Sequence, residues 1–196
     1  MENRTASVER VTKETKICMT LNLDGTGKSD IHTGIGFFDH MLDGFARHGL
    51  FDLAVDCHGD LEVDCHHTIE DTGIVLGKAF AEALPTKRGI RRFGHAYIPM
   101  DEALAFAAAD ISGRPFLVFS GEFPQERVGD YDTCMTEEFF RAFAANAGIT
   151  LHLRCEYGKN SHHMIEALFK AAAHALRDAL SQEEDPNLLL SSKGVL

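Results

Sequence analysis

The sequence lacks long apolar runs, paired cysteine motifs and a surplus of positive charge. No segment approaches the roughly 20 consecutive apolar residues that a transmembrane helix requires, so no membrane span is expected. The first residues are polar with no apolar run behind them, and we expect no secretory signal. The five cysteines are odd in number and never stand as C-x-x-C, which favours reduced thiols in the cytoplasm over a disulfide framework.

Positive charge is scarce. The 196 residues include 19 Lys and Arg against 30 Asp and Glu, a net charge of −11. A nucleic-acid-binding protein would be expected to carry the opposite balance, so we expect no nucleic acid partner. The densest basic cluster consists of Lys87, Arg88, Arg91 and Arg92. A positive patch on an acidic protein suits a small anion, and a solvated loop is the alternative.

A pattern of two histidines followed by glutamate occurs twice, at residues 66–71 (HHTIED) and 162–167 (HHMIEA), 96 positions apart. Each copy opens a helical run, so we expect its side chains on the first turns of a helix. Helical positions i and i+4 share a face and i and i+3 nearly do, so the glutamate can join either histidine at one metal ion. Adjacent histidines diverge by about 100° and cannot easily share an ion. Each copy is therefore interpreted as half of a site for two metal ions, and chance pairing on a surface helix is the alternative.

The predicted secondary structure repeats along the chain. In the first half we expect a strand over residues 5–23 with Glu14 inside it, a helix over 37–49 stopped by its last glycine, a strand from 53 and a helix over about 68–84. In the second half we expect strand or mixed segments over 96–100 and 103–109, a strand over 115–119, a helix over 136–147, a strand over 149–155 and a helix over 162–180. The order helix, strand, double-His helix occurs twice. It predicts an internal duplication, with half-repeats 1–94 and 95–196 in one compact unit, each a sheet with two helices.

The duplication points to further metal ligands. His40 stands 26 residues before His66, and Glu138 stands 24 residues before His162 in the matching helix. The full set of candidate ligands is His40, His66, His67, Glu70, Glu138, His162, His163 and Glu166. Imidazole and carboxylate groups are the usual ligands of divalent transition ions. Two ions sharing eight ligands would keep open positions for substrate, as a catalytic site requires.

Short motifs spread over nearly the whole chain carry a resemblance to a known family. They are residues 38–42 (FDHML), 66–71 (HHTIED), 92–94 (RFG), 99–103 (PMDEA), 112–115 (SGRP), 161–167 (SHHMIEA) and 191–194 (SSKG). Together these motifs resemble those of the imidazoleglycerol-phosphate dehydratases of histidine biosynthesis.

The resemblance carried by these motifs implies an α+β fold of two half-domains, each a four-stranded sheet with two helices, as in the second domain of a small-subunit ribosomal protein. It implies an enzyme with two manganese ions per active site that converts imidazoleglycerol phosphate to imidazoleacetol phosphate. It also implies a homo-oligomer of 24 subunits built from trimers, with active sites between neighbouring subunits.

The same resemblance assigns roles to individual residues. Glu14 would transfer a proton. The phosphate-binding residues would be Arg92, Arg114, Lys170, Ser192 and Lys193, and guanidinium and ammonium groups are suitable partners for a dianion. Family members often have histidine where this chain has Glu138; a carboxylate also binds manganese, and the relative metal preference is left open.

Two other classes of function stay open at this point. A metal-dependent phosphoester hydrolase could use paired His-x-x-x-Glu sites with a metal-bound water, and it would release inorganic phosphate. A non-catalytic metal-binding protein, for storage or sensing, could also use repeated His pairs, although it would have no reason for Glu14 or the basic cluster. A di-iron bundle is disfavoured because its Glu-x-x-His order is reversed here.

Overall fold

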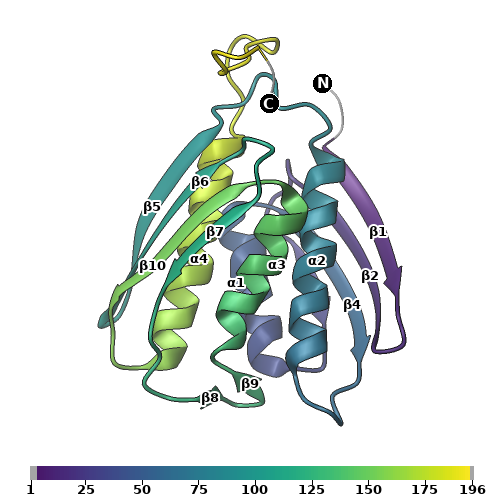
Figure 1. Ribbon diagram of the computed structural model, residues 1–196, viewed down its shortest axis with the longest axis vertical. Helices are drawn as coiled ribbons and strands as arrows, with labels where there is room; N and C mark the ends of the chain where they lie inside the picture. Colours follow the sequence, from purple (N-terminus) through teal and green to yellow (C-terminus); the bar gives the residue numbers. More distant parts are fainter. Residues whose placement is uncertain (1–3, 195–196) are drawn as a thin grey trace.

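A computed structural model describes residues 4–194 as two four-stranded sheets with four helices between them (Figure 1). The first half comprises β1 (Thr5–Val11), β2 (Thr15–Asn22), β3 (Ser29–His32), α1 (Gly36–Gly49), β4 (Asp52–Gly59) and α2 (His66–Ala83). The second half comprises β5 (Phe93–Met100), β6 (Ala103–Asp110), β7 (Phe116–Ser120), β8 (Arg127–Val128), β9 (Tyr131–Asp132), α3 (Met135–Ala147), β10 (Thr150–Tyr157) and α4 (Ser161–Leu180).

The two sheets share one topology. Their strand orders are β1-β2-β4-β3 and β5-β6-β10-β7. In both, the fourth position is filled by a strand that runs parallel to its neighbour, β3 beside β4 and β7 beside β10, while the remaining pairs are antiparallel. The predicted α+β fold, with a four-stranded sheet and two helices in each half, is confirmed. The short β8–β9 pair is an addition to the second half.

Each sheet buries one face against the helices because its side chains alternate between the two faces. In β2, Ile17, Met19 and Leu21 are at most 2% exposed and the residues between them face outward. In β6, the alanines at 103, 105, 107 and 109 face the helices in the same way. The core therefore lies in the helical layer between the sheets.

The helices pair across the two halves. In the helical layer α2 packs chiefly on α3, and α1 packs on α4. A Cβ atom added at Gly73 or Gly77 of α2 would lie 2.6 Å from the carbonyl oxygen of Phe139 or Phe143 of α3. Only glycine permits this close approach of two helix backbones. Because all four helices begin at the same end, the lower end in Figure 1, the double-His turns of both halves lie at that end.

Several local predictions were wrong. The predicted strand over residues 5–23 is a hairpin, and Glu14 lies in the turn between β1 and β2 rather than inside a strand. The hydroxyl of Thr12 accepts the backbone N–H groups of Glu14 and Thr15, which stabilises the chain reversal. By contrast, the predicted end of α1 at Gly49 is confirmed, and Leu50 after it takes the left-handed conformation, with φ 56°. Strand β3 and the β8–β9 pair were not predicted, because they are too short to show a period.

Two further findings concern the whole described chain. None of the helices formed by residues 4–194 combines the length and the apolar character needed to cross a lipid bilayer. All five cysteines are free thiols.

Candidate metal centre

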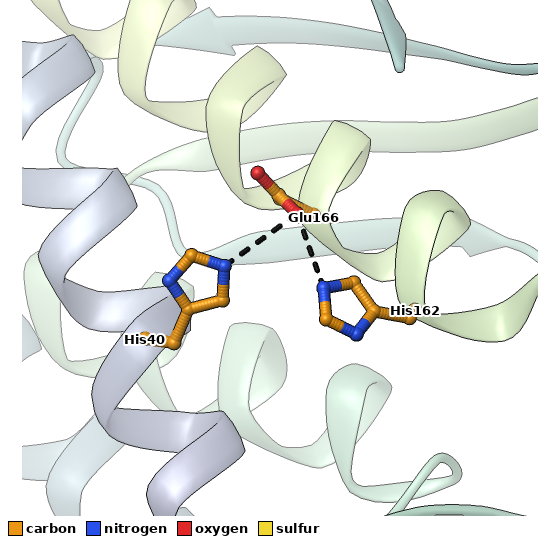
Figure 2. Close-up of side chains that lie close together, drawn as sticks. All are labelled: His40, His162 and Glu166. Atoms are coloured by element: carbon orange, nitrogen blue, oxygen red, sulfur yellow. Dashed lines mark ion pairs between the residues drawn. The ribbon is translucent and has the colours of Figure 1, made fainter. Parts of the chain in front are cut away.

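The first helical turns of α1 and α4 bring three predicted ligands together (Figure 2). Nε2 of His40 lies 3.6 Å from Oε2 of Glu166, and Nε2 of His162 lies 3.3 Å from the same oxygen. Two atoms bound about 2.1 Å from one ion stand roughly 3.0–3.5 Å apart, so these separations suit a common ion. Within residues 4–194 this is the one group of three or more such side chains whose ligand atoms all lie within 4.8 Å of one another.

The carboxylate of this group is buried and ionised. Glu166 is 7% exposed, and its Oε1 lies 2.7 Å from Nζ of Lys170, with which it forms an ion pair. Burial raises the pKa of Glu166, but Lys170 and the nearby His40 and His162 outweigh burial and hold that pKa below its ordinary value. Lys170 thus neutralises one oxygen and leaves the other facing the two imidazoles. This donor set of two imidazoles and one carboxylate fits a divalent transition ion.

The second group, on α2 and α3, is less complete. Nε2 of His66 lies 3.7 Å from Oε2 of Glu70, which is the i and i+4 pairing of the two that the motif allows. Glu138, the predicted ligand on α3, forms an ion pair with Arg141 at 3.1 Å. Arg141 also binds Glu137 at 2.6 Å. The structure therefore joins His66 with Glu70, while a cation of its own helix holds Glu138.

The second histidine of each pair is bound to a loop carboxylate instead. Nδ1 of His67 lies 2.9 Å from Oδ2 of Asp60, and Nδ1 of His163 lies 2.7 Å from Oε2 of Glu102. These hydrogen bonds raise the pKa of both imidazoles above the ordinary value. The first histidine of each pair therefore has a glutamate partner on its own helix, and the second has a partner on a loop.

Glu102 is itself held by its surroundings. Its Oε1 accepts the backbone N–H groups of Lys159 at 3.1 Å and Asn160 at 2.8 Å, just before α4 begins. The hydrogen bond from His163 and these two backbone donors lower the pKa of Glu102 to about 2. Neither Asp60 nor Glu102 was singled out from the sequence. Glu102 lies inside the motif at 99–103, but no helical or strand period connects either residue to its histidine.

Glu14 lies next to one of these second histidines. Its Oε1 is 3.9 Å from Nε2 of His67, and its side chain is 53% exposed. The second half has a comparable contact, since Oδ2 of Asp101, in the turn between β5 and β6, is 3.6 Å from Nε2 of His163. In both halves a hairpin turn thus presents an exposed carboxylate to the Nε2 side of the second histidine.

Four of the five predicted phosphate-binding residues belong to segments at the opposite end of the molecule, the upper end in Figure 1: the starts of β5 and β7 and the C-terminal segment. There the backbone N–H of Arg92 donates to the carbonyl oxygen of Ala179, near the end of α4. Arg92 donates from Nε to Oδ1 of Asp110 at 2.7 Å, and Arg114 donates to Oδ2 of Asp110 at 3.4 Å. Arg92 also donates to the carbonyl oxygen of Leu190. The two other candidates, Ser192 and Lys193, follow Leu190 closely in the chain and are exposed.

Lys170 is the exception. Its ammonium lies 3.4 Å from the sulfur of Met100, the last residue of β5, whereas Arg92 directly precedes the first residue of that strand. Eight strand residues at about 3.3 Å each span roughly 26 Å. One chain therefore does not bring Lys170 together with the other four residues.

Comparisons with known proteins agree over nearly the whole chain. The family described as imidazoleglycerol-phosphate dehydratase matches residues 33–176. The chain is 57% identical over 196 residues to the imidazoleglycerol-phosphate dehydratase of Gluconacetobacter diazotrophicus, covering 98% of each protein. It is 58% identical over 193 residues to that of Clostridium acetobutylicum, again covering 98% of each.

Solved structures give the same result. The crystal structure of imidazoleglycerol-phosphate dehydratase from Staphylococcus aureus is similar with a TM-score of 0.83 at 41% identity, over 91% of this chain and 99% of that one. The dehydratase from Pyrococcus furiosus is similar with a TM-score of 0.83 at 35% identity, over 96% of this chain and 100% of that one.

Proposed function

Because the chain belongs to the imidazoleglycerol-phosphate dehydratase family, a family of lyases in histidine biosynthesis, we propose that it converts imidazoleglycerol phosphate to imidazoleacetol phosphate and water at a site with two manganese ions. The observation that carries the proposal is the group of His40, His162 and the ionised Glu166 at the start of two helices. Family membership disfavours both the phosphoester hydrolase and the non-catalytic metal-binding alternatives.

The metal assignment is supported by the chemistry of the donor set. Imidazole and carboxylate groups with open positions suit a divalent ion of the first transition row, and manganese accepts both oxygen and nitrogen ligands. When bound, the ions would polarise the imidazole ring of the substrate and stabilise the negative charge that expels its hydroxyl group. In this proposal His66 and Glu70, with Glu138, supply ligands for the second ion.

Glu14 is proposed as the general base. The hydroxyl leaves the carbon attached to the imidazole, and Glu14 takes the proton from the neighbouring carbon, giving an enol that becomes the ketone. Its place in an exposed turn, 3.9 Å from Nε2 of His67, supports the role, because a substrate bound near that imidazole would lie within its reach. The proton and the hydroxyl group together account for the water removed.

Arg92, Arg114, Lys170, Ser192 and Lys193 are proposed to bind the phosphate, which would hold the substrate so that its proton faces Glu14. The roughly 26 Å of β5 between Arg92 and Lys170 supports a site built from several copies of the chain, since one copy cannot bring them to one phosphate. We therefore propose a homo-oligomer, of 24 subunits built from trimers as the family resemblance implies. The five free thiols support a cytoplasmic location.

The test is an assay of dehydration with manganese present, after chelation and after manganese is restored. We expect imidazoleacetol phosphate to form with manganese, to cease after chelation and to return with the metal. Release of inorganic phosphate would instead favour a hydrolase. Tight metal binding without turnover would favour a storage or sensor protein.

A further inference from the structure

The two rings of each double-His pair contact different carboxylates through different nitrogens. In the first ring Nε2 faces the glutamate four residues later, His66 toward Glu70 and His162 toward Glu166. In the second ring it is Nδ1 that is bound. The partners of the second rings are Asp60 for His67 and Glu102 for His163.

A carboxylate that is hydrogen-bonded to Nδ1 determines which of the two ring nitrogens carries the proton. An ionised carboxylate has no hydrogen to donate, so Nδ1 must carry the proton of the hydrogen bond. In the neutral imidazole the lone pair is then on Nε2, which becomes the atom able to bind a metal. The nearest acidic groups on the Nε2 side of the two rings are exposed: Glu14 is 53% and Asp101 72% exposed in the side chain. The Nε2 atoms of His67 and His163 therefore face the surface of the chain, beside these exposed carboxylates.

We propose that Asp60 and Glu102 are positioning residues that hold His67 and His163 with Nε2 directed outward, each to bind a divalent ion presented by a neighbouring copy of the chain. The inference rests on the proposed function, because it takes the double-His turns as metal ligands. It adds two residues to which neither the sequence motifs nor the family membership gave a role.

Asp60 and Glu102 come from different positions in the two halves, which supports a shared role in positioning the histidines. Asp60 directly follows β4, whereas Glu102 lies in the turn between β5 and β6, and these loops do not correspond in the duplication. The same hydrogen bond to Nδ1 is therefore made from two unrelated positions. A contact merely inherited with the repeat would come from equivalent positions.

The test measures manganese binding by calorimetry and by electron paramagnetic resonance on the assembled protein, without substrate and at fixed pH. Removing an outer-shell partner of a metal-bound histidine lowers metal affinity by about 10- to 100-fold. We expect losses of this size in Asp60→Ala and Glu102→Ala. We expect a smaller loss in Asp60→Asn, because the amide oxygen can still accept from Nδ1.

Asp64→Asn is the matched control. Asp64 lies in the loop of Asp60, but it accepts the backbone N–H of His66, a bond that asparagine also makes. The Asp64→Asn substitution removes one negative charge and no hydrogen bond to an imidazole. The manganese affinity of this variant should therefore match that of the unmodified protein.

Unchanged affinity in both alanine variants would overturn the proposal, and so would an equal loss in Asp64→Asn. If Asp60→Ala does not fold, Asp60→Asn decides, because it should bind manganese less tightly than Asp64→Asn; equal affinity would contradict the inference. Because binding is measured without substrate, a protein that shows these differences but no dehydration would contradict the proposed function alone.

Discussion

Two groups of candidate ligands arise from the same repeated pattern. The α1/α4 group consists of His40, His162 and Glu166, and the α2/α3 group consists of His66, Glu70 and Glu138. The two groups differ in how complete they are in one chain. In the first, Lys170 stands four residues after Glu166 and binds the oxygen away from the histidines. In the second, Ile74 holds the position four residues after Glu70, and Arg141 binds Glu138 itself. Lys170 thus leaves one oxygen of Glu166 available to a metal ion. Arg141, in contrast, would compete with a metal ion for Glu138.

The two groups also differ in burial. The Glu166 side chain is 9% exposed, whereas those of Glu70 and Glu138 are 41% and 30% exposed. Electrostatic interactions weaken with solvent exposure, so we expect the α1/α4 group to bind the first manganese ion and the α2/α3 group the second.

The largest effect is expected where the two halves present different carboxylates to their second histidines. Glu14→Gln should lower kcat by about 10²- to 10⁴-fold because it removes the proposed general base, while manganese and substrate still bind. The counterpart change Asp101→Asn should leave kcat closer to that of the unmodified enzyme. Steady-state kinetics with parallel binding measurements test this; loss of substrate binding in Glu14→Gln would remove Glu14 from the chemistry.

Glu166→Gln should break the better-formed group. We expect its manganese affinity to fall by more than about 100-fold, since a direct ligand is worth more than an outer-shell partner. Lys170, 18% exposed, would also lose its counter-charge, which should lower the free energy of unfolding by about 1–3 kcal/mol. Glu70→Gln should weaken metal binding but change the unfolding free energy by less than about 0.5 kcal/mol, because Glu70 is exposed. Metal titration and urea unfolding measure both; equal destabilisation would contradict the comparison.

The close contact of α2 with α3 gives a prediction on stability. Gly77→Ala should lower the free energy of unfolding by about 1–3 kcal/mol, because its Cβ would meet backbone atoms of α3 at 2.6–2.9 Å. Gly44 in the middle of α1 has no atom within 4 Å of such a Cβ. Gly44→Ala should therefore stabilise the protein by roughly 0.5–1 kcal/mol. Urea unfolding of the two variants checks whether the signs are opposite.

Arg141→Gln should increase affinity for the second manganese ion by several-fold, because it releases Glu138 from an exposed ion pair that is worth about 0.2–1 kcal/mol. A merely structural role for Arg141 predicts the reverse, a loss of affinity. A two-site titration distinguishes these outcomes, and the affinity for the first ion serves as the internal control. An unchanged second affinity would show that Arg141 does not compete for Glu138.

The smallest effect concerns the α1/α4 contact at low pH. Nδ1 of His48 lies 3.3 Å from Nε2 of His174, and burial lowers the pKa of both imidazoles, with nearby Lys170 adding to the effect on His48. The folded chain therefore binds fewer protons at this pair than the unfolded chain, and the contribution of the pair to stability should fall as pH drops below about 6.5. His174→Gln should reduce that fall by less than about 1.4 kcal/mol per pH unit. Urea midpoints of the metal-free protein at pH 5 and 7 test it, with the exposed His152→Gln as control.

Local sequence patterns predicted part of the site, because residues three or four apart on a helix lie on the same face. The helical repeat predicted that the glutamate of each motif can join either histidine, and the structure shows the i and i+4 pairs, His66 with Glu70 and His162 with Glu166. The duplication identified His40 as a candidate ligand by its spacing from His66, but its contact with Glu166 depends on the packing of α1 on α4. Asp60 and Glu102 could not be found from periodicity, since their hydrogen bonds depend on where loops meet a helix after folding.

The prediction of strands was also limited, because the alternation of apolar residues does not show where the chain reverses. One alternating pattern runs through residues 5–23, and nothing in that alternation marks the reversal at Thr12 that places Glu14 in a turn. The long helices were identified correctly because several turns of apolar periodicity define each of them.

Anomalous diffraction at the manganese edge from crystals of the manganese-loaded protein tests the central claim most directly. We predict two ions per chain. One should lie between His40, His162 and Glu166, the other beside His66 and Glu70, and Nε2 of a second histidine from a neighbouring copy should complete each. Ions bound elsewhere, or coordinated by one chain alone, would contradict the account.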